Sequence, residues 1–379
     1  MSSVKSIESL PDELFESIVD YAAACDRFSC EYHIQGPRKR QLMQIALSCK
    51  KLCRAALKIL WKNKFDGDFN TASLVLLLRC LRREVKQSLS IYELLPGNPS
   101  MPYGTFINSI SLEKLFRYVD QWLQEQVSQG LLASNRPERR REVARELLRL
   151  FKSSNEPLEK LRWVGFHENE VWVTNYQVIL EPEFSQWIRN IHILDIQGTF
   201  DFTDLVDKLV DMCTNISNLT FSFYCFGTTP FVKNITAALK LIRAQNALRV
   251  LSWGGIQGMQ RNHEDPDDIY GNDPTALLAT LDGQKSTLRE LRLAHMDFEN
   301  IDLLTDLAIC QNLQILTFEY CSNIRARAIE PMMNEAYASL EKVEINYCVN
   351  FQAMEDFARA RRVLRNNRDR SDDNPDMWN

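Results

Sequence analysis

Cysteine is the residue type in this chain with the clearest capacity for chemistry, because thiolates bind zinc and attack electrophiles. The 379 residues include ten cysteines. Cys49 and Cys53 are four apart and would share a helix face, and Cys25 and Cys30 lie upstream, but the sequence has no C-x-x-C pair and no matched pair of histidines. The pattern is typical of small buried residues with reduced thiols, so we expect no metal and no other cofactor.

A glycine-rich and acidic stretch at residues 254–274 could bind phosphate or a cation. The glycines of residues 254–258 lack the G-K-S/T sequence that a phosphate-binding loop requires. His263, Glu264, Asp265 and Asp267 have the side chains of a metal cluster, but their surroundings have the composition of a surface loop. Insertions in repeat proteins often collect on the binding face, so we expect residues 254–274 to help select a target.

An arginine-rich stretch at residues 137–151 could bind phosphate groups. Glutamates precede three of the arginines by three residues, at Glu138, Glu142 and Glu146. That spacing favours ion pairs along a solvated helix face over a nucleic-acid site. The sequence also lacks G-x-S-x-G, H-E-x-x-H, Walker and dinucleotide-binding motifs. We therefore predict a protein that is not an enzyme.

A short apolar phrase recurs along the chain and dominates its organisation. It is most complete at residues 313–324 (LQILTFEYCSNI) and 340–351 (LEKVEINYCVNF). Shorter L-x-x-L-x-L versions precede these two, mostly at intervals of 25 to 40 residues. Such recurrence is the signature of a solenoid, and this spacing is that of the leucine-rich repeat. The shorter versions are Ile107/Ile110/Leu112, Leu158/Leu161/Trp163, Ile191/Leu194/Ile196, Ile216/Leu219/Phe221, Leu248/Leu251/Trp253 and Leu288/Leu291/Leu293.

Alternation within each phrase predicts a short strand whose apolar side chains point into the stack. Residues 204–210, 235–242 and 303–308 change to helical periodicity between the phrases. The predicted fold is therefore α/β, an irregular solenoid with short parallel strands on one face and helices on the other. Cys321 and Cys348 occupy matching positions, where a thiol can pack as a small hydrophobe and donate weakly to a carbonyl.

The N-terminal residues have a different pattern, that of a small helical module. It contains SLPDELFESIVDY, then LMQIALSCKKLCRAAL, then a closing Leu60-Trp61 pair. Residues 10–61 resemble an F-box, and the repeats with a cysteine at Cys321 and Cys348 are similar to those that accompany F-boxes. The resemblance implies a non-catalytic module that docks on the Skp-type linker of an SCF ubiquitin ligase. The residues implied to bind the linker are Leu10, Pro11, Leu14, Ile18, Leu47, Leu60 and Trp61.

The resulting division of the chain has four parts. A helical F-box-like module covers residues 1–66, and a helical connector with an irregular first repeat covers residues 67–157. The solenoid covers residues 158–358, and a charged tail covers residues 359–379. The connector is predicted to contain helices at 72–85, 115–127 and 137–151. An alternative for the N-terminal module is a cap that shields the first repeat, because solenoids need a polar end.

Composition limits the partners. The net charge is −5 and the pI is about 5.7, which argues against nucleic acid as the main partner. No apolar run approaches the roughly 20 residues that a membrane span needs, and the first residues are too polar for a signal peptide. We expect no membrane partner and a cytoplasmic or nuclear location.

The resemblance implies a substrate-recognition subunit of an SCF-type E3 ligase, with a linker and cullin at one end and an unknown target protein on the repeats. The alternatives are a non-ligase scaffold built on the same repeats and an F-box protein that binds the linker without the cullin. Outward-facing strand residues are the predicted target contacts: Arg162, His192, Asp195, Thr220, Ser222, Ser252, Arg292, Thr317, Glu319, Glu344 and Asn346.

Overall fold

The computed structural model contains eight parallel strands in one open sheet, and the strands follow one another in sequence order. The described residues before 163, together with 175–188, form one compact unit, and residues 163–165 with those from 189 onward form another. The structure describes residues 50–62, 64–66, 69–95, 97–134, 136–153, 156–165, 175–198, 201–224, 230–256, 274–301, 304–333 and 339–360.

The first unit is mainly helical. Asn70 caps one helix by accepting a hydrogen bond from the Ser73 backbone N–H at 2.9 Å, and Ser111 caps another through the Lys114 N–H at 3.4 Å. Its elements are α3 (Lys50–Lys62), η2 (Lys64–Asp66), α4 (Thr71–Cys80), α5 (Arg83–Ser88), η3 (Tyr103–Phe106), β1 (Ser109–Ser111), α6 (Leu112–Ser128), α7 (Pro137–Lys152), the start of β2 (Lys160–Gly165), η4 (Asn175–Leu180), η5 (Pro182–Phe184) and α8 (Ser185–Ile188).

The predicted helix at residues 72–85 is wrong in one respect, because the structure divides it into α4 and α5. Leu81 has an extended backbone, with φ −62° and ψ 145°, and so ends α4. Its side chain is nevertheless buried with Leu74, Leu77 and Leu78, as the apolar pattern predicts. Periodicity identified the buried face, but it could not locate the break because Leu81 serves the same core after the chain changes direction.

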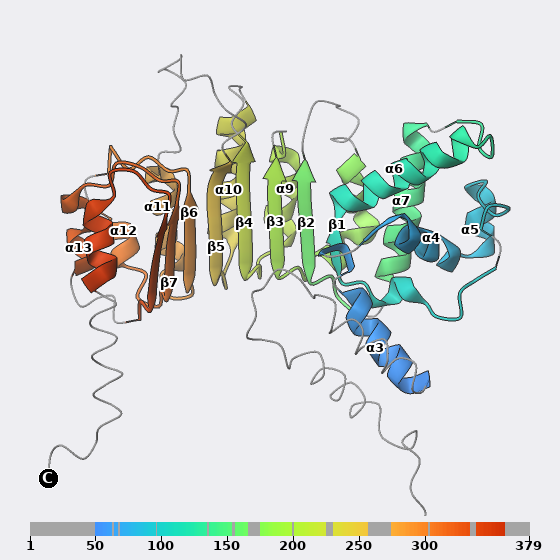
Figure 1. Ribbon diagram of the computed structural model, residues 1–379, viewed down its shortest axis with the longest axis horizontal. Helices are drawn as coiled ribbons and strands as arrows, with labels where there is room; N and C mark the ends of the chain where they lie inside the picture. Colours follow the sequence, from blue (N-terminus) through green and yellow to red (C-terminus); the bar gives the residue numbers. More distant parts are fainter. Residues whose placement is uncertain are drawn as a thin grey trace, which may run out of the picture. The chain divides into compact units, whose positions relative to one another are not determined.

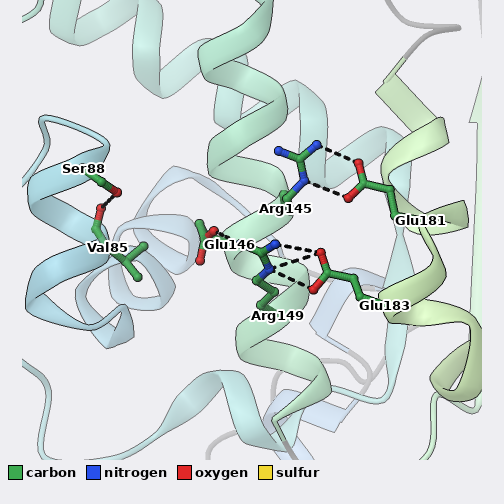
Figure 2. Close-up of polar contacts among 7 residues, drawn as sticks. All are labelled: Val85, Ser88, Arg145, Glu146, Arg149, Glu181 and Glu183. Carbon is green, nitrogen blue, oxygen red and sulfur yellow. Dashed lines mark hydrogen bonds and ion pairs between the residues drawn. The ribbon is translucent and has the colours of Figure 1, made fainter.

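One predicted ion pair along α7, between Glu146 and Arg149, is present, but two arginines of this helix also pair with glutamates outside it. Figure 2 shows Arg145 and Arg149 pointing from α7 toward Glu181 and Glu183. The Arg145 guanidinium donates to both oxygens of Glu181, at 2.9 and 2.7 Å. Arg149 pairs with Glu183 at 2.8 Å as well as with Glu146, and its hydrogen bond lowers the pKa of Glu183. The arginines therefore attach the segment that contains η4 and η5 to α7.

The second unit is built from parallel strands joined by helices (Figure 1). In Figure 1, α9 (Thr203–Met212) and α10 (Pro230–Ala244) lie behind the strands, and the two helices pack against each other. The strands are the end of β2, β3 (Ile193–Gly198), β4 (Asn218–Tyr224), β5 (Val250–Ile256), β6 (Glu290–Ala294), β7 (Ile315–Glu319) and β8 (Lys342–Asn346). The shorter helices are α11 (Thr275–Leu278), η7 (Leu281–Gln284), α12 (Thr305–Ala308), η8 (Ala326–Ile329) and α13 (Glu330–Met333), and residues 352–360 are also helical.

The strand register confirms the predicted alignment of the apolar phrases. In the second unit, Leu219, Leu251 and Leu291 are paired residue to residue across β4, β5 and β6, and the rows continue into β7 and β8. These leucines are completely buried. The arrangement gives each strand a neighbour to cover its apolar side chains, which no strand could do alone. Phe202, Phe221, Phe223 and Trp253 add a cluster of aromatic rings to this core.

Two buried glutamines attach the helical side of the second unit to the starts of its strands. The Gln245 amide donates to the carbonyl of Cys213 at 2.9 Å, and its oxygen accepts from the Ile216 N–H at 2.9 Å. Gln284 donates to the carbonyls of Ile242 and Gln245 at 3.0 and 2.8 Å. Backbone groups at the loops thus find partners away from water, as buried polar groups must.

Candidate functional site

The candidate site is the strand face, which we define as the outward side chains of β3 to β8 in the second unit. Register places these side chains in three rows that cross the strands. The first row is Ile193, Asn218, Val250, Glu290, Ile315 and Lys342; the second is Asp195, Thr220, Ser252, Arg292, Thr317 and Glu344; the third is Gln197, Ser222, Gly254, Ala294, Glu319 and Asn346.

The structure brings most of the predicted target contacts together on this face, in the second and third rows. Arg292 and Asn346 are exposed, whereas most of the others are half-buried. His192 is exposed just before β3, and Arg162 is half-buried in the first unit. The half-buried predicted contacts on the strand face are Asp195, Thr220, Ser222, Ser252, Glu319 and Glu344.

Thr317 is the exception, because the prediction that it presents its side chain to solvent is wrong. Only 1% of Thr317 is exposed. It lies in register between Arg292 and Glu344, and its hydroxyl donates to the Glu344 carboxylate at 3.3 Å. Alternation along one strand gives the direction of a side chain, but the side chains of neighbouring strands decide whether water reaches it.

The charges on the strand face are largely paired within it. Arg292 forms an ion pair with Glu290 at 2.6 Å, and Lys342 pairs with Glu344 at 2.5 Å. The hydrogen bond from Lys342 is the main cause that lowers the pKa of Glu344. Each pair joins the first and second rows of one strand, so these charges are already partly neutralised before any partner binds.

The first row was missed by the sequence reasoning and makes the face less polar than predicted. Ile193, Val250 and Ile315 are half-buried on this row. In the third row, Gly254 lies opposite Ala294, and a Cβ at Gly254 would come within 2.8 Å of the Ala294 Cβ. Gly254 therefore has a packing role in β5, where adjacent strands approach too closely for a larger residue.

Three stacked rings follow the third row and were also missed; we call them the aromatic ladder. His295, Tyr320 and Tyr347 come directly after β6, β7 and β8. The His295 and Tyr320 rings lie 4.9 Å apart with a 3° interplanar angle, and Tyr320 and Tyr347 lie 4.9 Å apart with an 11° angle. Burial lowers the pKa of His295, which favours its neutral form. The sequence contained a signal for this stack, because each ring is two residues after the last apolar residue of an L-x-x-L-x-L pattern, at Leu293, Phe318 and Ile345.

The backbone of the aromatic ladder is in the left-handed region. The φ angles are 55° at His295, 52° at Tyr320 and 56° at Tyr347. This region costs residues with a Cβ about 1–2 kcal/mol, and glycine or asparagine usually occupies it. The same turn has asparagine further on, at Asn323 and Asn350, with φ 61° and 57°. Two tyrosine rings in this backbone region need a reason beyond the turn itself.

Two thiols lie next to the aromatic ladder and behave differently. Cys321 is 1% exposed and donates to the Leu293 carbonyl at 3.3 Å, which confirms its predicted role as a small buried residue with a weak donor. Cys348 is half-buried and lies near the Asn346 carbonyl at 3.5 Å. The hydrogen bond between the two thiols raises the pKa of Cys321 and lowers the pKa of Cys348 to about 7.

We expect iodoacetamide at pH 7 to alkylate Cys348 faster than the other cysteines in the described ranges, because the thiolate is the nucleophile. Burial raises the pKa of Cys213 and Cys310 to about 12. Cys321→Ala removes the thiol hydrogen bond, so the rate at Cys348 should fall about threefold once nucleophilicity is allowed for. Peptide mass spectrometry of time points measures both rates. Alkylation of Cys213 before Cys348 would contradict this prediction. The control is Cys80→Ala, which removes a thiol far from Cys348 in the sequence and should leave the rate at Cys348 unchanged.

The residues predicted to bind a Skp-type linker are only partly within the described chain. Leu10, Pro11, Leu14, Ile18 and Leu47 lie outside it. Leu60 is half-buried, but Trp61 is only 6% exposed and its ring lies 4.9 Å from that of Tyr103. The indole is therefore part of the core of the first unit. Leu60 and Trp61 are adjacent in the sequence, but consecutive residues of a helix point their side chains in different directions.

The remaining predictions concern the acidic stretch around His263, metal binding and membrane spans. Residues 257–273, which include His263 and its acidic neighbours, lie outside the described residues, as do Cys25, Cys30 and Cys49. Within the part of the chain that the structure describes, no group of three or more His, Cys, Asp or Glu side chains could hold a metal ion. In that same part, every helix is too short or too polar to cross a membrane.

The sequence matches no family model and no curated protein. What the chain does must therefore be inferred from the strand face, the aromatic ladder and the sequence patterns.

Proposed function

We propose that the chain is the substrate-recognition subunit of an SCF-type E3 ubiquitin ligase. In this proposal, residues 9–61 dock on a Skp-type linker, and the strand face holds a target protein. The repeats are leucine-rich repeats, and the N-terminal module is an F-box. The chain is an adaptor and not a catalyst, because the ligase supplies the charged E2 through the cullin.

The strand face is the observation that carries the proposal. Six parallel strands of the second unit present three aligned rows of outward side chains. The rows mix half-buried apolar residues such as Ile315 with charged residues such as Arg292 and Glu319. This mixture suits a protein partner better than nucleic acid, because no cluster of unpaired cations is present on the face as described.

An adaptor of this kind would act by effective concentration. Holding the target and the linker on one chain makes transfer of ubiquitin to a target lysine effectively intramolecular. Such a mechanism needs two separate surfaces and no catalytic side chain. The strand face would be one surface, and the apolar residues Leu10, Leu14 and Ile18 would be part of the other.

A second candidate function is a scaffold that bridges proteins without a ubiquitin ligase. Trp61 favours it, since the indole that the F-box resemblance assigns to the linker is 6% exposed and packs beside Tyr103. In this alternative, the N-terminal residues are a cap of the first unit. The strand face would have the same role in both functions.

A pull-down separates the two functions. The purified full chain is mixed with a Skp-type linker, beside a Leu10→Glu/Leu14→Glu variant whose circular dichroism and urea midpoint match those of the native chain. We expect the native chain to retain the linker and the variant to lose it, because two buried charges in an apolar contact cost several kcal/mol.

The matched control is Leu131→Glu, which makes the same chemical change at a leucine that is 52% exposed. This variant should bind the linker like the native chain. If the native chain does not retain the linker, the adaptor proposal fails and the scaffold function replaces it. Equal retention by the native chain and the double variant would show that residues 9–61 are not the linker surface.

A further inference from the structure

Two rings of the aromatic ladder, those of Tyr320 and Tyr347, are exposed, whereas His295 is half-buried. Tyr320 is 49% exposed and Tyr347 is 77% exposed, and Val349, two residues after Tyr347, is 62% exposed. Large exposed rings at adjacent positions are unusual on a surface with no partner. β8 is the last strand of the sheet in the described chain, so no further described strand adds a ring beyond Tyr347.

The three residues of the aromatic ladder have a backbone conformation that is unfavourable for residues with a Cβ. All three residues have a left-handed φ, although glycine, which has no Cβ, would make the same turn with less strain. The rings are parallel and regularly spaced, at 4.9 Å between centroids in both steps. The turn therefore holds flat π-surfaces in a fixed orientation at the carboxyl ends of β6, β7 and β8.

The charge beside the ladder is negative. Glu319 immediately precedes Tyr320, and it is half-buried in the third row. Among the described residues, no cation is recorded in an ion pair with the Glu319 carboxylate, whereas Arg292 and Lys342 are paired with Glu290 and Glu344. The uncompensated charge of the region thus lies next to the rings.

We propose that the aromatic ladder and Glu319 bind an arginine side chain of the target protein. The guanidinium is planar and positively charged, so it can lie on the face of Tyr347 that is turned away from Tyr320. Glu319 supplies a carboxylate with two acceptor oxygens for its N–H groups. This inference rests on the proposed target-holding role of the strand face and specifies the chemistry of the target.

Arginine fits these features better than the other ligands of flat aromatic surfaces. A lysine ammonium is a compact, strongly hydrated charge and gains less from a planar stack. A nucleic-acid base would bring phosphates toward Glu319, and like charges repel. A neutral aromatic side chain would make no use of the carboxylate.

The test measures binding of fluorescein-labelled hexa-arginine to the purified full chain by anisotropy at low salt, with hexa-citrulline and hexa-lysine as comparison peptides. We expect hexa-arginine to bind most tightly and hexa-citrulline, which keeps the planar group without its charge, at least about tenfold more weakly. Tyr347→Ala should weaken hexa-arginine binding about threefold, and Tyr320→Ala/Tyr347→Ala about tenfold, from the strength of exposed cation–π contacts. Tyr347→Phe should retain binding, because its ring is unchanged.

Glu319→Gln should also weaken binding, whereas Glu355→Gln makes the same charge change at an exposed residue of the last helix and should not. If the double alanine variant fails to fold, Tyr347→Ala carries the test, since its ring is mostly in solvent. Equal binding of hexa-arginine and hexa-lysine, or no loss in Tyr347→Ala, would overturn the inference. The assay contains no linker, so its failure leaves the pull-down result standing, and the reverse also holds.

Discussion

Phe318→Ala is expected to destabilise the second unit by about 3–5 kcal/mol, the usual cost of removing a buried phenylalanine ring. Phe318 is completely buried in β7. The centroid of its ring lies 5.7 Å from that of Phe298 and 5.4 Å from that of Phe351, both in edge-to-face geometry. Phe298 and Phe351 come from neighbouring repeats. Alanine would leave a cavity between three repeats, and rigid strands on both sides would prevent it from closing.

Urea unfolding followed by near-ultraviolet circular dichroism measures this loss. Phe318→Leu should cost less, because it keeps part of the buried volume. Val349→Ala removes methyl groups from a side chain that is 62% exposed and should change the midpoint little. A loss below about 1 kcal/mol for Phe318→Ala would contradict a core shared between the repeats.

Lys86→Met is expected to destabilise the first unit by about 3 kcal/mol, because several carbonyl groups would lose a buried donor. Lys86 is 1% exposed, which is rare for lysine. Its ammonium donates to the Asn98 amide oxygen at 2.9 Å and to the Gly97 carbonyl at 3.2 Å, with Arg79 and Leu95 carbonyls at 3.4 Å. Methionine keeps the length and apolar stem of lysine, so the loss isolates these hydrogen bonds.

The effect of Lys86 should depend on pH. Burial is the main cause that lowers its pKa, so the folded chain releases this proton at a lower pH than the unfolded chain does. Between the folded pKa and the unfolded value of about 10.4, the unfolded chain binds more protons at Lys86, and the stability contributed by this residue rises with pH. The difference in the free energy of unfolding between the native and Lys86→Met chains should therefore increase as the pH rises through that window.

Thermal unfolding of both chains at several pH values measures this difference. Gln87→Met is the matched control, because it places the same side chain at the next residue of α5, where the position is exposed. It should have little effect at any pH. A difference that decreases with rising pH would mean that the charged amine is favoured in the folded state, contrary to its burial.

The local sequence pattern was enough to predict the parallel strands of the second unit. The phrases at Leu219, Leu251 and Leu291 predict strands, and register pairs the same residues across the sheet. Period-two alternation is a local property that depends on the pleat, so sequence reveals it directly. The buried thiol of Cys321 followed from the same alignment of repeats.

Whether an outward residue meets solvent or another side chain could not be predicted from local periodicity. Thr317 is covered by its neighbours in adjacent strands, and Arg145 pairs with Glu181, which is 36 residues away in sequence. Trp61 is enclosed by the core of the first unit. The His295, Tyr320 and Tyr347 rings form a ladder because register places successive repeats at one level. Each of these depends on contacts between distant parts of the chain, which local periodicity does not contain.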